Sequence, residues 1–376
     1  MNRILIVLAC LVVFNSSKAQ YTLRVVVNEA ASKDADDWYV AGSFNNWHPR
    51  EDAFKLKPFG TKRKAIVLSD LPAGKYQFKI TRGSWEKGET SAEGGAIANR
   101  EVDVISDTIV YVRVAGWQDD YPSKPKPNTA TAQVQIIDTA FKIPQLNRTR
   151  RIWAYLPKGY ATSKKSYPVI YMHDGQNLFN EQTAPFGEWG VDEAIDTLQT
   201  KFKKEAIIIG IDNGGDKRMV EYNPYDNAQF GKGEGDKYVD FLALTLKPYI
   251  DKTFRTRKDS AHTFIAGSSM GGLISLYAVA KYPNVFGGAG VFSPAFWTAP
   301  ALYDAVSNTT WKGTNKIYFY AGGKEGGLMI PDMEKMIKIV EAKGKSHLRI
   351  IKAPLGQHNE PTWRKYFPDF YSWIID

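Results

Sequence analysis

The stretch "TFIAGSSMGGLISLY", residues 263–277, joins a strand-like run to a helix-like run through two adjacent serines. A turn of this kind is typical of a nucleophile elbow, where the nucleophile has a strained backbone and the residues two before and two after it must be small. Centred on the second serine, Ser269, these positions are Gly267 and Gly271, whereas centring on the first would put the bulky Met270 there. The register therefore selects Ser269 as the candidate nucleophile.

The sequence around this turn, residues 134–376, alternates apolar strand-like runs with helical periods. Between Asp236 and Asp251 the apolar side chains recur along one helix face, at Val239, Leu242, Leu246 and Ile250. Apolar strands that alternate with helices predict a mostly parallel sheet with helices on both faces. We therefore expect an α/β-hydrolase fold, with its site where polar and glycine-rich residues follow the strands.

A serine nucleophile needs a histidine as base and an acid that orients the histidine. Of the five histidines, His358 follows the last predicted strand and precedes the last helix, which is where an α/β-hydrolase keeps this residue. The acid should lie between serine and histidine in the chain, at a strand end. Glu325, in "KIYFYAGGKEGG", is the favoured residue. Asp332 is the alternative, although it also suits a helix start, where the helix dipole favours a carboxylate.

Acyl transfer also needs donors for the oxyanion that forms at the ester carbonyl. One donor is expected from the backbone N–H of Met270, the residue after the nucleophile, and the second from Gln176 in the strand-end loop "HDGQN". The histidines are dispersed and no His-x-x-x-His pair is present. We therefore expect no metal site.

The first half of the chain has a different composition. Residues 21–116 hold short strand-like runs separated by turn signals, which predicts an all-β, immunoglobulin-like sandwich of about seven strands. Residues 117–133, "WQDDYPSKPKPNTATAQ", are rich in proline and threonine, as expected of a linker. The sequence thus predicts two domains, 21–116 and 134–376.

Residues 1–20 are typical of a signal peptide, with Arg3 before an apolar run and a small-residue cleavage site at Ser17 to Ala19. A membrane anchor and a lipoprotein processed at Cys10 are the alternatives. Cleavage before Gln20 would remove the only cysteine and lower the formal charge from +9 to +7. We expect a secreted or periplasmic protein with no membrane span.

The positive charges are scattered among acidic residues, so the formal charge of +9 does not indicate a nucleic-acid partner. The two densest basic runs, "TKRK" at 61 and "NRTRR" at 147, are short. Solvated surface explains them better than a nucleic-acid footprint does.

Several ordered motifs in residues 134–376 together resemble the putative esterase family of α/β-hydrolases, which includes esterase D-like, feruloyl, acetylxylan and trilactone siderophore esterases. The resemblance implies a serine carboxylesterase that works without a cofactor. Ser269 and His358 match the family's positions, whereas the acid there is often Asp, so Glu325 is a departure. The motifs are "RRIWAYLPKGY", "YPVIYMHDGQNLF", "GEWGVDEAI", "IIIGIDNGGDKRMVEYNPY", "GSSMGGLISLYA" and "GVFSPAFW".

The first half resembles immunoglobulin-like glycogen- and starch-binding modules, through "VAGSFNNWHP" and "YQFKITRGSWEKGET". Trp47, Lys79 and Trp85 match the positions that stack on sugars in such modules. Exposed indole rings suit sugar C–H faces, and an ammonium group can bond hydroxyls. The alternatives are that these tryptophans belong to the core, or that the module has lost glycan binding and only packs on the esterase half.

The glycine-rich segment 212–238 is expected to overlie a strand end and to form part of the substrate pocket. Within it, Arg218 is expected either to pair with Glu221 or to meet an anionic substrate group. Trp189, in "GEWGVDEA", is expected near the same face, where an aromatic side chain could hold a feruloyl ring. The expected export and the glycan-module-like first half favour a carbohydrate-linked ester, a feruloyl or acetyl ester of a plant polysaccharide, as the first substrate class. The alternatives are a siderophore trilactone esterase and a non-catalytic glycan-binding protein on a hydrolase scaffold.

Overall fold

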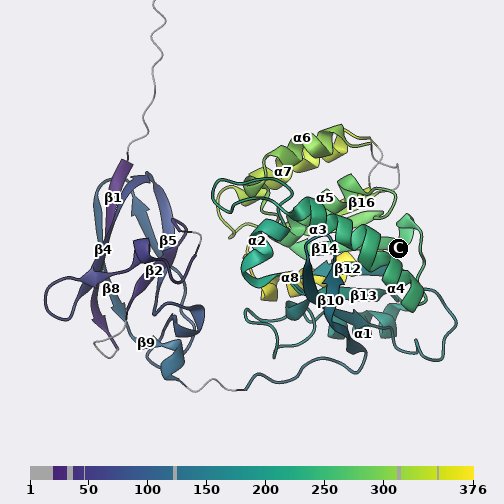
Figure 1. The fold of residues 1–376 in the computed structure, drawn as a ribbon, viewed down its shortest axis with the longest axis horizontal. Coiled ribbons are helices and arrows are strands. Elements are labelled where there is room, and N and C mark those ends of the chain that lie inside the picture. The colour runs from purple at the N-terminus through teal and green to yellow at the C-terminus, as the bar shows by residue number, and fades with distance from the viewer. Residues whose placement is uncertain (1–19, 32–36, 46, 122–124, 311–314, 345–346) are drawn as a thin grey trace, which may run out of the picture. The chain divides into compact units, whose positions relative to one another are not determined.

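The computed structural model describes residues 20–31, 37–45, 47–121, 125–310, 315–344 and 347–376. The predicted signal peptide lies outside these ranges except for Gln20, which begins the first strand. The chain forms two compact units, Met1–Lys124 and Pro125–Asp376. Each unit is described by itself below (Figure 1).

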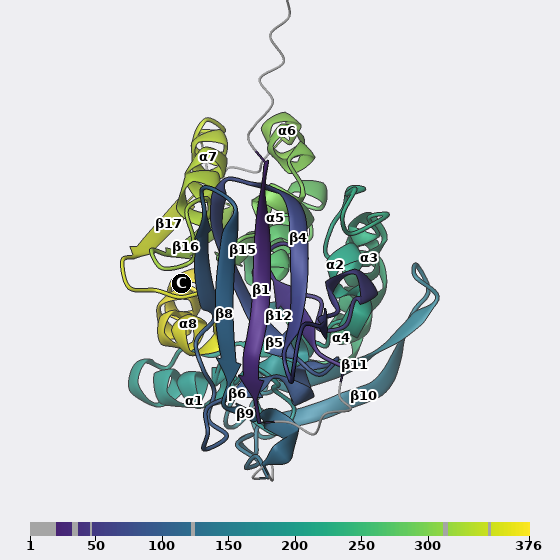
Figure 2. The same ribbon diagram turned by 90° about the vertical axis from the view of Figure 1, so that its left-hand side faces the viewer.

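The first unit consists of strands arranged in three sheets, ordered β3-β4-β1-β8, β2-β5-β7 and β6-β9. Figure 2 shows β1 between β4 and β8; it runs antiparallel to β4 and parallel to β8. Inward-facing side chains of the two larger sheets share one hydrophobic core. The bounds are β1 Gln20–Ala30, β2 Tyr39–Gly42, β3 Lys57–Pro58, β4 Lys64–Pro72, β5 Gly74–Thr81, β6 Glu89–Thr90, β7 Arg100–Val104, β8 Thr108–Val114 and β9 Gly116–Trp117.

The all-β character of this half agrees with the prediction, while the immunoglobulin-like topology stays a prediction. The described residues of this unit form six longer strands and three strands of two residues, against about seven expected. The unit also extends past residue 116, because Trp117 is fully buried in its core. Further along the expected linker 117–133, Thr131 donates its backbone N–H to Asp192 of the second unit at 2.7 Å. Both ends of that segment are therefore held by folded structure.

The second unit is built on one eight-stranded sheet, ordered β10-β11-β13-β12-β14-β15-β16-β17. β10, β11 and β13 pair antiparallel, and all strands from β13 to β17 pair parallel. The strands are β10 Val134–Ile143, β11 Arg148–Tyr155, β12 Val169–His173, β13 Ile207–Ile211, β14 Thr263–Ser268, β15 Gly288–Phe292, β16 Lys316–Gly322 and β17 His347–Ala353. The mostly parallel sheet of the predicted α/β-hydrolase fold is thus confirmed.

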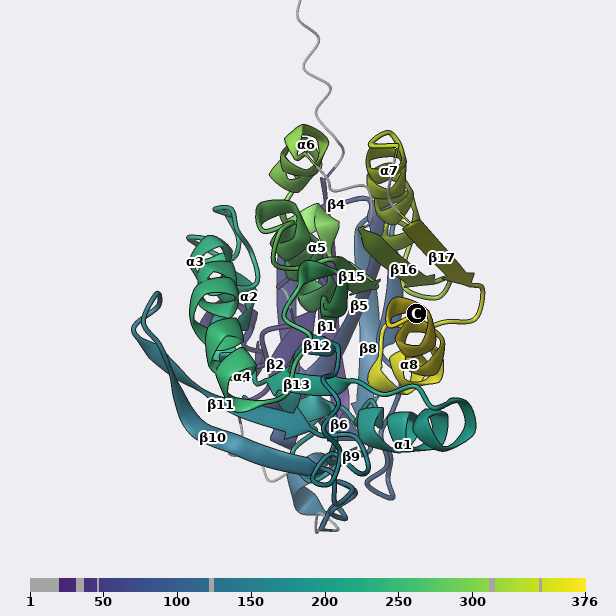
Figure 3. The ribbon, with the colours of Figure 1, turned by 90° about the vertical axis from the view of Figure 1, so that its right-hand side faces the viewer.

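Helices cover both faces of this sheet, as Figure 3 shows. One hydrophobic cluster joins the sheet to α3 through α7, and a second joins the other face to α1 and α8. All four apolar residues of the predicted stripe, from Val239 to Ile250, are fully buried. The helices are α1 Val191–Phe202, α2 Arg218–Glu221, α3 Gly235–Phe241, α4 Lys247–Thr253, α5 Met270–Lys281, α6 Ala301–Asn308, α7 Met329–Glu341 and α8 Glu360–Ile374.

A buried ion network ties the long segment after β13 to strand β11. The carboxylate of Glu221, which is fully buried, accepts hydrogen bonds from Arg148 at 2.7 Å and from Arg150 at 2.7 and 2.6 Å. Arg148 also pairs with Glu234 at 2.6 Å. Because the segment carrying both glutamates crosses the carboxyl edge of the sheet, this network holds one wall of that edge in place.

Replacing Glu221 with Gln should lower the free energy of unfolding by about 2–4 kcal/mol, because two arginines lose their shared buried countercharge. The matched control is Glu334→Gln, which removes an exposed pair with Lys352 and should cost less than about 1 kcal/mol. Urea unfolding of both variants measures the difference. Equal losses would contradict a structural role for the buried network.

Candidate active site

Ser269 occupies the turn between β14 and α5 with φ 58° and ψ −119°, a conformation that non-glycine residues rarely adopt. The turn needs small neighbours. A Cβ added to Gly267 would lie 2.9 Å from the carbonyl carbon of Gly271. The backbone N–H of Ser269 donates to the Phe292 carbonyl of the next strand at 2.9 Å. Of the two adjacent serines, only Ser269 has a positive φ, as the elbow register predicted.

His358 lies in the loop between β17 and α8, and its ring is hydrogen bonded to a carboxylate. Nδ1 is 3.0 Å from Oε2 of Glu325, whose side chain is fully buried. An ionised carboxylate only accepts, so Nδ1 carries the proton and Nε2 is left as the basic nitrogen. Asp332, the alternative acid, lies in the first turn of α7 and forms no hydrogen bond to His358 among the described residues; its carbonyl accepts from Tyr303 at 3.2 Å.

The carboxylate of Glu325 is held by further residues. Two of these, Ser293 and Trp363, were not predicted from the sequence. Oε1 of Glu325 accepts from the hydroxyl of Ser293 at 2.8 Å and from the backbone N–H of Gly322 at 2.7 Å. Ser293 in turn accepts from the indole N–H of Trp363 at 2.9 Å, and the ring of His358 packs edge-on against that indole at 5.1 Å. Ser293 follows β15 with φ 45°, so its position directly after a predicted strand was the available signal.

The two expected oxyanion donors both lie at the start of a helical segment that follows a strand of the sheet. Met270 is the first residue of α5, and Gln176 lies in a 3₁₀ turn, Gly175–Asn177, directly after β12. Backbone N–H groups in a first helical turn have no intrahelical acceptor, so both are available to a ligand. The side chain of Gln176 accepts from the backbone N–H of Asn213 at 3.2 Å, which holds this turn against the segment after β13.

Arg218 is paired, but not with Glu221 as one expectation had it. Its guanidinium binds Asp174 through two hydrogen bonds of 2.7 and 2.9 Å, and it donates to the carbonyl of Ser268 at 3.4 Å. Burial acts to raise the pKa of Asp174, but Arg218 and the amide of Asn213 outweigh it and hold that pKa below its ordinary value. Arg218 therefore braces the strand end beside the elbow and is not a free cation for a substrate anion.

Trp189 does not line the substrate face, which corrects the expectation. It is only 3% exposed and packs against Phe292 at 5.1 Å and Trp363 at 5.7 Å. These rings belong to the cluster between the sheet and helices α1 and α8. Trp363 also contacts His358, so Trp189 supports the histidine indirectly through Trp363. Because Trp189 is buried, it offers no surface to a ligand.

Two other histidines of the described residues have partners of their own. His173 is buried at the end of β12, where Nδ1 lies 3.0 Å from the Tyr238 hydroxyl and burial lowers its pKa to about 3, so the ring is neutral. His262 pairs with Asp259 just before β14 begins.

Nowhere in the described ranges do three or more His, Cys, Asp or Glu side chains gather as a metal-binding group. Nor does any described helix combine the length and apolar character that a membrane crossing requires.

The three expected sugar contacts belong to the first unit but differ in availability. Trp47 and Trp85 are partly exposed, with ring centroids 6.3 Å apart. The ammonium of Lys79 donates to the carbonyl of Ile97 at 2.8 Å, and burial lowers its pKa. The indole pair is accessible, whereas the lysine already has a partner.

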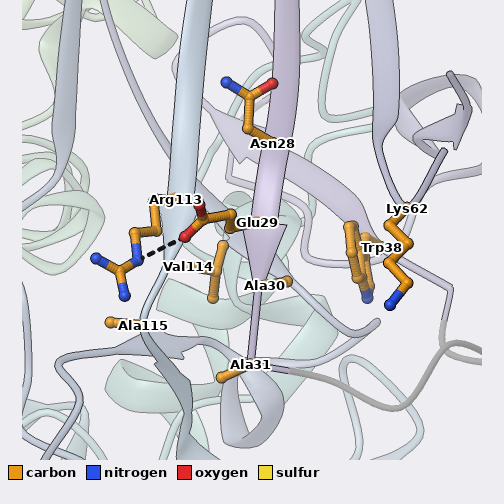
Figure 4. A pocket seen from close by; sticks show the side chains of 9 residues that line it. All are labelled: Asn28, Glu29, Ala30, Ala31, Trp38, Lys62, Arg113, Val114 and Ala115. Carbon is orange, nitrogen blue, oxygen red and sulfur yellow. Dashed lines mark ion pairs between the residues drawn. The ribbon is translucent and has the colours of Figure 1, made fainter. Parts of the chain in front are cut away.

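A separate hollow of about 440 Å³ in this unit is shown in Figure 4. An ion pair between Arg113 and Glu29 closes one side at 3.0 Å, and Trp38 and Lys62 lie on the other. Trp38 is only 5% exposed, and the ammonium of Lys64 covers its ring at 4.4 Å from the centroid. This hollow therefore presents no open aromatic face to a ligand.

A mostly parallel sheet with a strained serine between strand and helix is the architecture of the α/β-hydrolase class. Residues 143–370, well over half of the chain, match the family described as "Putative esterase". The chain therefore belongs to this esterase family.

Curated relatives of the chain include two named esterases. The "Iron(III) enterobactin esterase" of Dickeya dadantii (strain 3937) is 26% identical over 264 residues, which are 65% of this chain and 55% of that protein. The "Endo-1,4-beta-xylanase/feruloyl esterase" of Xylanibacter ruminicola is 27% identical over 217 residues, 56% of this chain and 27% of that protein. The aligned part is thus about half or less of each relative.

Solved structures with a similar fold include the enterobactin esterase FES of Shigella flexneri determined with enterobactin. It is 17% identical with a TM-score of 0.53, over 96% of this chain and 94% of that one. A ferulic acid esterase is 20% identical with a TM-score of 0.51, over 65% of this chain and 97% of that one. At these identities the likeness concerns the fold alone.

Replacing Gly267 with Ala should lower kcat on any ester substrate at least about tenfold, because the added methyl group would push the backbone at Gly271 and misplace Ser269. Gly74→Ala is the matched control, since its added Cβ would meet its nearest neighbour only at 3.9 Å. Steady-state kinetics with p-nitrophenyl acetate, after circular dichroism confirms folding, measures the effect. Unchanged kcat in Gly267→Ala would contradict a strained elbow.

Glu360, the first residue of α8, is buried two positions after His358 and accepts from Asn177 at 3.2 Å. Burial raises its pKa from the ordinary 4.5 to about 7. Because the folded state then binds the proton more tightly than the unfolded state, stability contributed by this group is lost as pH rises from 4.5 through 7. A shift of this size corresponds to about 3 kcal/mol.

Glu360→Gln should therefore gain stability relative to the wild type between pH 4.5 and pH 8, by about 3 kcal/mol. Urea unfolding at a series of pH values measures this difference. The exposed Glu341→Gln serves as the control and should follow the wild-type pH dependence. A Glu360→Gln profile parallel to that of the wild type would show that the carboxyl titrates normally.

Proposed function

We propose that this chain is a serine carboxylesterase with Ser269 as nucleophile, His358 as general base and acid, and Glu325 as the acid that orients the histidine. The observation that carries the proposal is the 3.0 Å contact between His358 Nδ1 and the buried carboxylate of Glu325, in a unit whose elbow strains Ser269. The three residues follow one another in the chain as Ser269, Glu325 and His358, which is the order of the α/β-hydrolase triad.

In this mechanism, Nε2 of His358 takes the proton of the Ser269 hydroxyl as the oxygen attacks the ester carbonyl. The backbone N–H groups of Met270 and Gln176 stabilise the oxyanion of the tetrahedral intermediate. The imidazolium then protonates the leaving alcohol, and an acyl-enzyme remains. Water, deprotonated by the same histidine, attacks the acyl carbon, and the imidazolium returns that proton to Ser269 Oγ as the bond between Oγ and the acyl carbon breaks and the carboxylic acid leaves.

For the substrate, we propose a carbohydrate-linked ester as the first class. The support is the 27% identity with a xylanase/feruloyl esterase and the accessible indole pair of Trp47 and Trp85 in the first unit. A siderophore trilactone is the second class, favoured by the 26% identity with an enterobactin esterase over 264 residues. Glycan binding by the first unit and export directed by residues 1–20 stay predictions.

Hydrolysis of a substrate panel by the wild type and by Ser269→Ala tests the enzyme proposal. The panel is p-nitrophenyl acetate, methyl ferulate, acetylated xylan and a ferric trilactone siderophore. Loss of the nucleophile should lower kcat by a factor on the order of 10⁵–10⁶ on each accepted substrate. Activity that survives in Ser269→Ala would refute the nucleophile, and a folded wild type that hydrolyses nothing would favour a glycan-binding protein.

Replacing each candidate acid by its amide, in two separate variants, decides which of them orients His358. Glu325→Gln should lower kcat by roughly 10³–10⁴-fold, because His358 loses the acceptor that orients it and stabilises its charge. Asp332→Asn should stay within about twofold of the wild type, since within the described residues Asp332 forms no hydrogen bond or ion pair with His358. The same steady-state assay measures both variants. The reverse order of effects would transfer the role to Asp332.

A further inference from the structure

Beside the Gln176 turn, the second unit contains a cavity of about 470 Å³ that the mechanism above does not use. Its walls come from the loop after β12, the segment after β13, strand β11 and the chain just before β10. We propose that this cavity is a substrate subsite that binds a carboxylate-bearing, oxygen-rich part of the ester. The proposal rests on the proposed function and specifies its substrate class.

One wall of the cavity is a segment that follows the first unit, here called the strap and defined as residues 125–131. Its Lys126 lines the cavity and donates to the carbonyl of Ala184. The hydroxyl of Thr129 donates to Glu188 at 2.8 Å, and Thr131 N–H donates to Asp192 at 2.7 Å. Because several hydrogen bonds hold the strap against the loop after β12, this wall is formed before any ligand arrives, which lowers the entropy cost of binding.

Arg151 supplies the group that would recognise a carboxylate. Its Nε donates to Asp212 at 2.7 Å, and the indole N–H of Trp153 donates to the other carboxylate oxygen at 2.7 Å. Neither terminal nitrogen of Arg151 makes a hydrogen bond to another residue in the described part of the chain. A guanidinium edge with two free nitrogens matches a carboxylate in bidentate geometry.

The charges around the cavity also favour an anion. Lys126 and Arg151 are cationic, and Asp212, which pairs with Arg151, is the one carboxylate among the lining residues, so the lining has a net formal charge of one positive unit. The cavity therefore carries an excess of positive charge beside the oxyanion donors. A negatively charged substrate group would be attracted to it, and a neutral one would gain nothing from it.

The other lining groups suit hydroxyl or carbonyl oxygens. Gln182 presents an amide side chain that both donates and accepts, and the amide nitrogen of Gln176 is a further donor, whereas the amide of Asn213 already bonds Asp174 and Gly215. None of the residues that line the cavity is aromatic, so a phenolic ring has no stacking partner there. Two sources supply the required chemistry: a sugar acid within an oligosaccharide, and the free carboxylate of an N-acylated hydroxy amino acid.

Isothermal titration calorimetry of the full chain with two matched ligand pairs tests the proposal. The first pair is glucuronic-acid-substituted xylotriose and plain xylotriose. The second is N-benzoylserine and N-benzoylserinamide. In at least one pair the carboxylate-bearing ligand should bind about tenfold more tightly than its neutral twin. A response of the first pair identifies a sugar acid, and a response of the second identifies a hydroxy acid.

The affinity ratio is the affinity for the carboxylate-bearing ligand divided by that for its neutral twin. Arg151→Gln should lower this ratio to about 1–2. Lys126→Gln, in the exposed strap, should lower it by about threefold. Arg349→Gln is the matched control, because Arg349 also lies on a strand and pairs with an aspartate, Asp369, but lies outside the cavity. Its ratio should equal that of the wild type.

Equal affinities within both pairs for the wild type would overturn the proposal, as would a ratio that neither Arg151→Gln nor Lys126→Gln changes. Calorimetry reads binding without turnover, so these outcomes do not depend on catalysis. Failure of the proposed function is read separately, as the absence of Ser269-dependent hydrolysis of p-nitrophenyl acetate, a substrate that has no group for this cavity.

Discussion

The strained backbone of Ser269 is the constraint on which the rest of the site depends. A φ of 58° with a ψ of −119° is unfavourable for serine by roughly 1–3 kcal/mol, so neighbouring structure must hold it. β14 lies inside the parallel sheet, and the glycines at 267 and 271 allow the strand and helix to meet closely. The hydroxyl is thereby fixed at the carboxyl edge of the sheet, where the segments after the other strands converge.

The buried carboxylate of Glu325 is a second constraint on the fold, because it needs hydrogen-bond donors from several segments. A fully buried carboxylate is costly unless hydrogen bonds satisfy it, and here Ser293, the backbone of Gly322 and His358 all do so. Ser293 is held by Trp363 of α8, the helix that begins just after the histidine loop. The ends of β15, β16 and β17 are thus linked through one hydrogen-bonded group, which limits the orientations of the imidazole.

The segments that surround this centre are fixed by ion pairs and hydrogen bonds. Arg218 holds Asp174 at the end of β12, and Glu221 ties the segment after β13 to β11. Hydrogen bonds likewise hold the strap against the loop after β12 and the start of α1. Such bracing gives preformed walls, which is what a site needs to orient an ester against a single nucleophile.

The sequence by itself determined the strained turn at Ser269, the mostly parallel sheet and the buried helix stripe beginning at Val239. Each was inferred from residues close together in the chain: the small residues on either side of Ser269, and the spacing of apolar residues within each strand or helix. Glu325 remained open against Asp332, and Trp189 and Arg218 were misjudged as substrate contacts. Their surroundings come from strands and helices far away in sequence. Only the tertiary structure decided which carboxylate meets His358 and which side chains the core encloses, because contacts between distant segments form only when the whole sheet assembles.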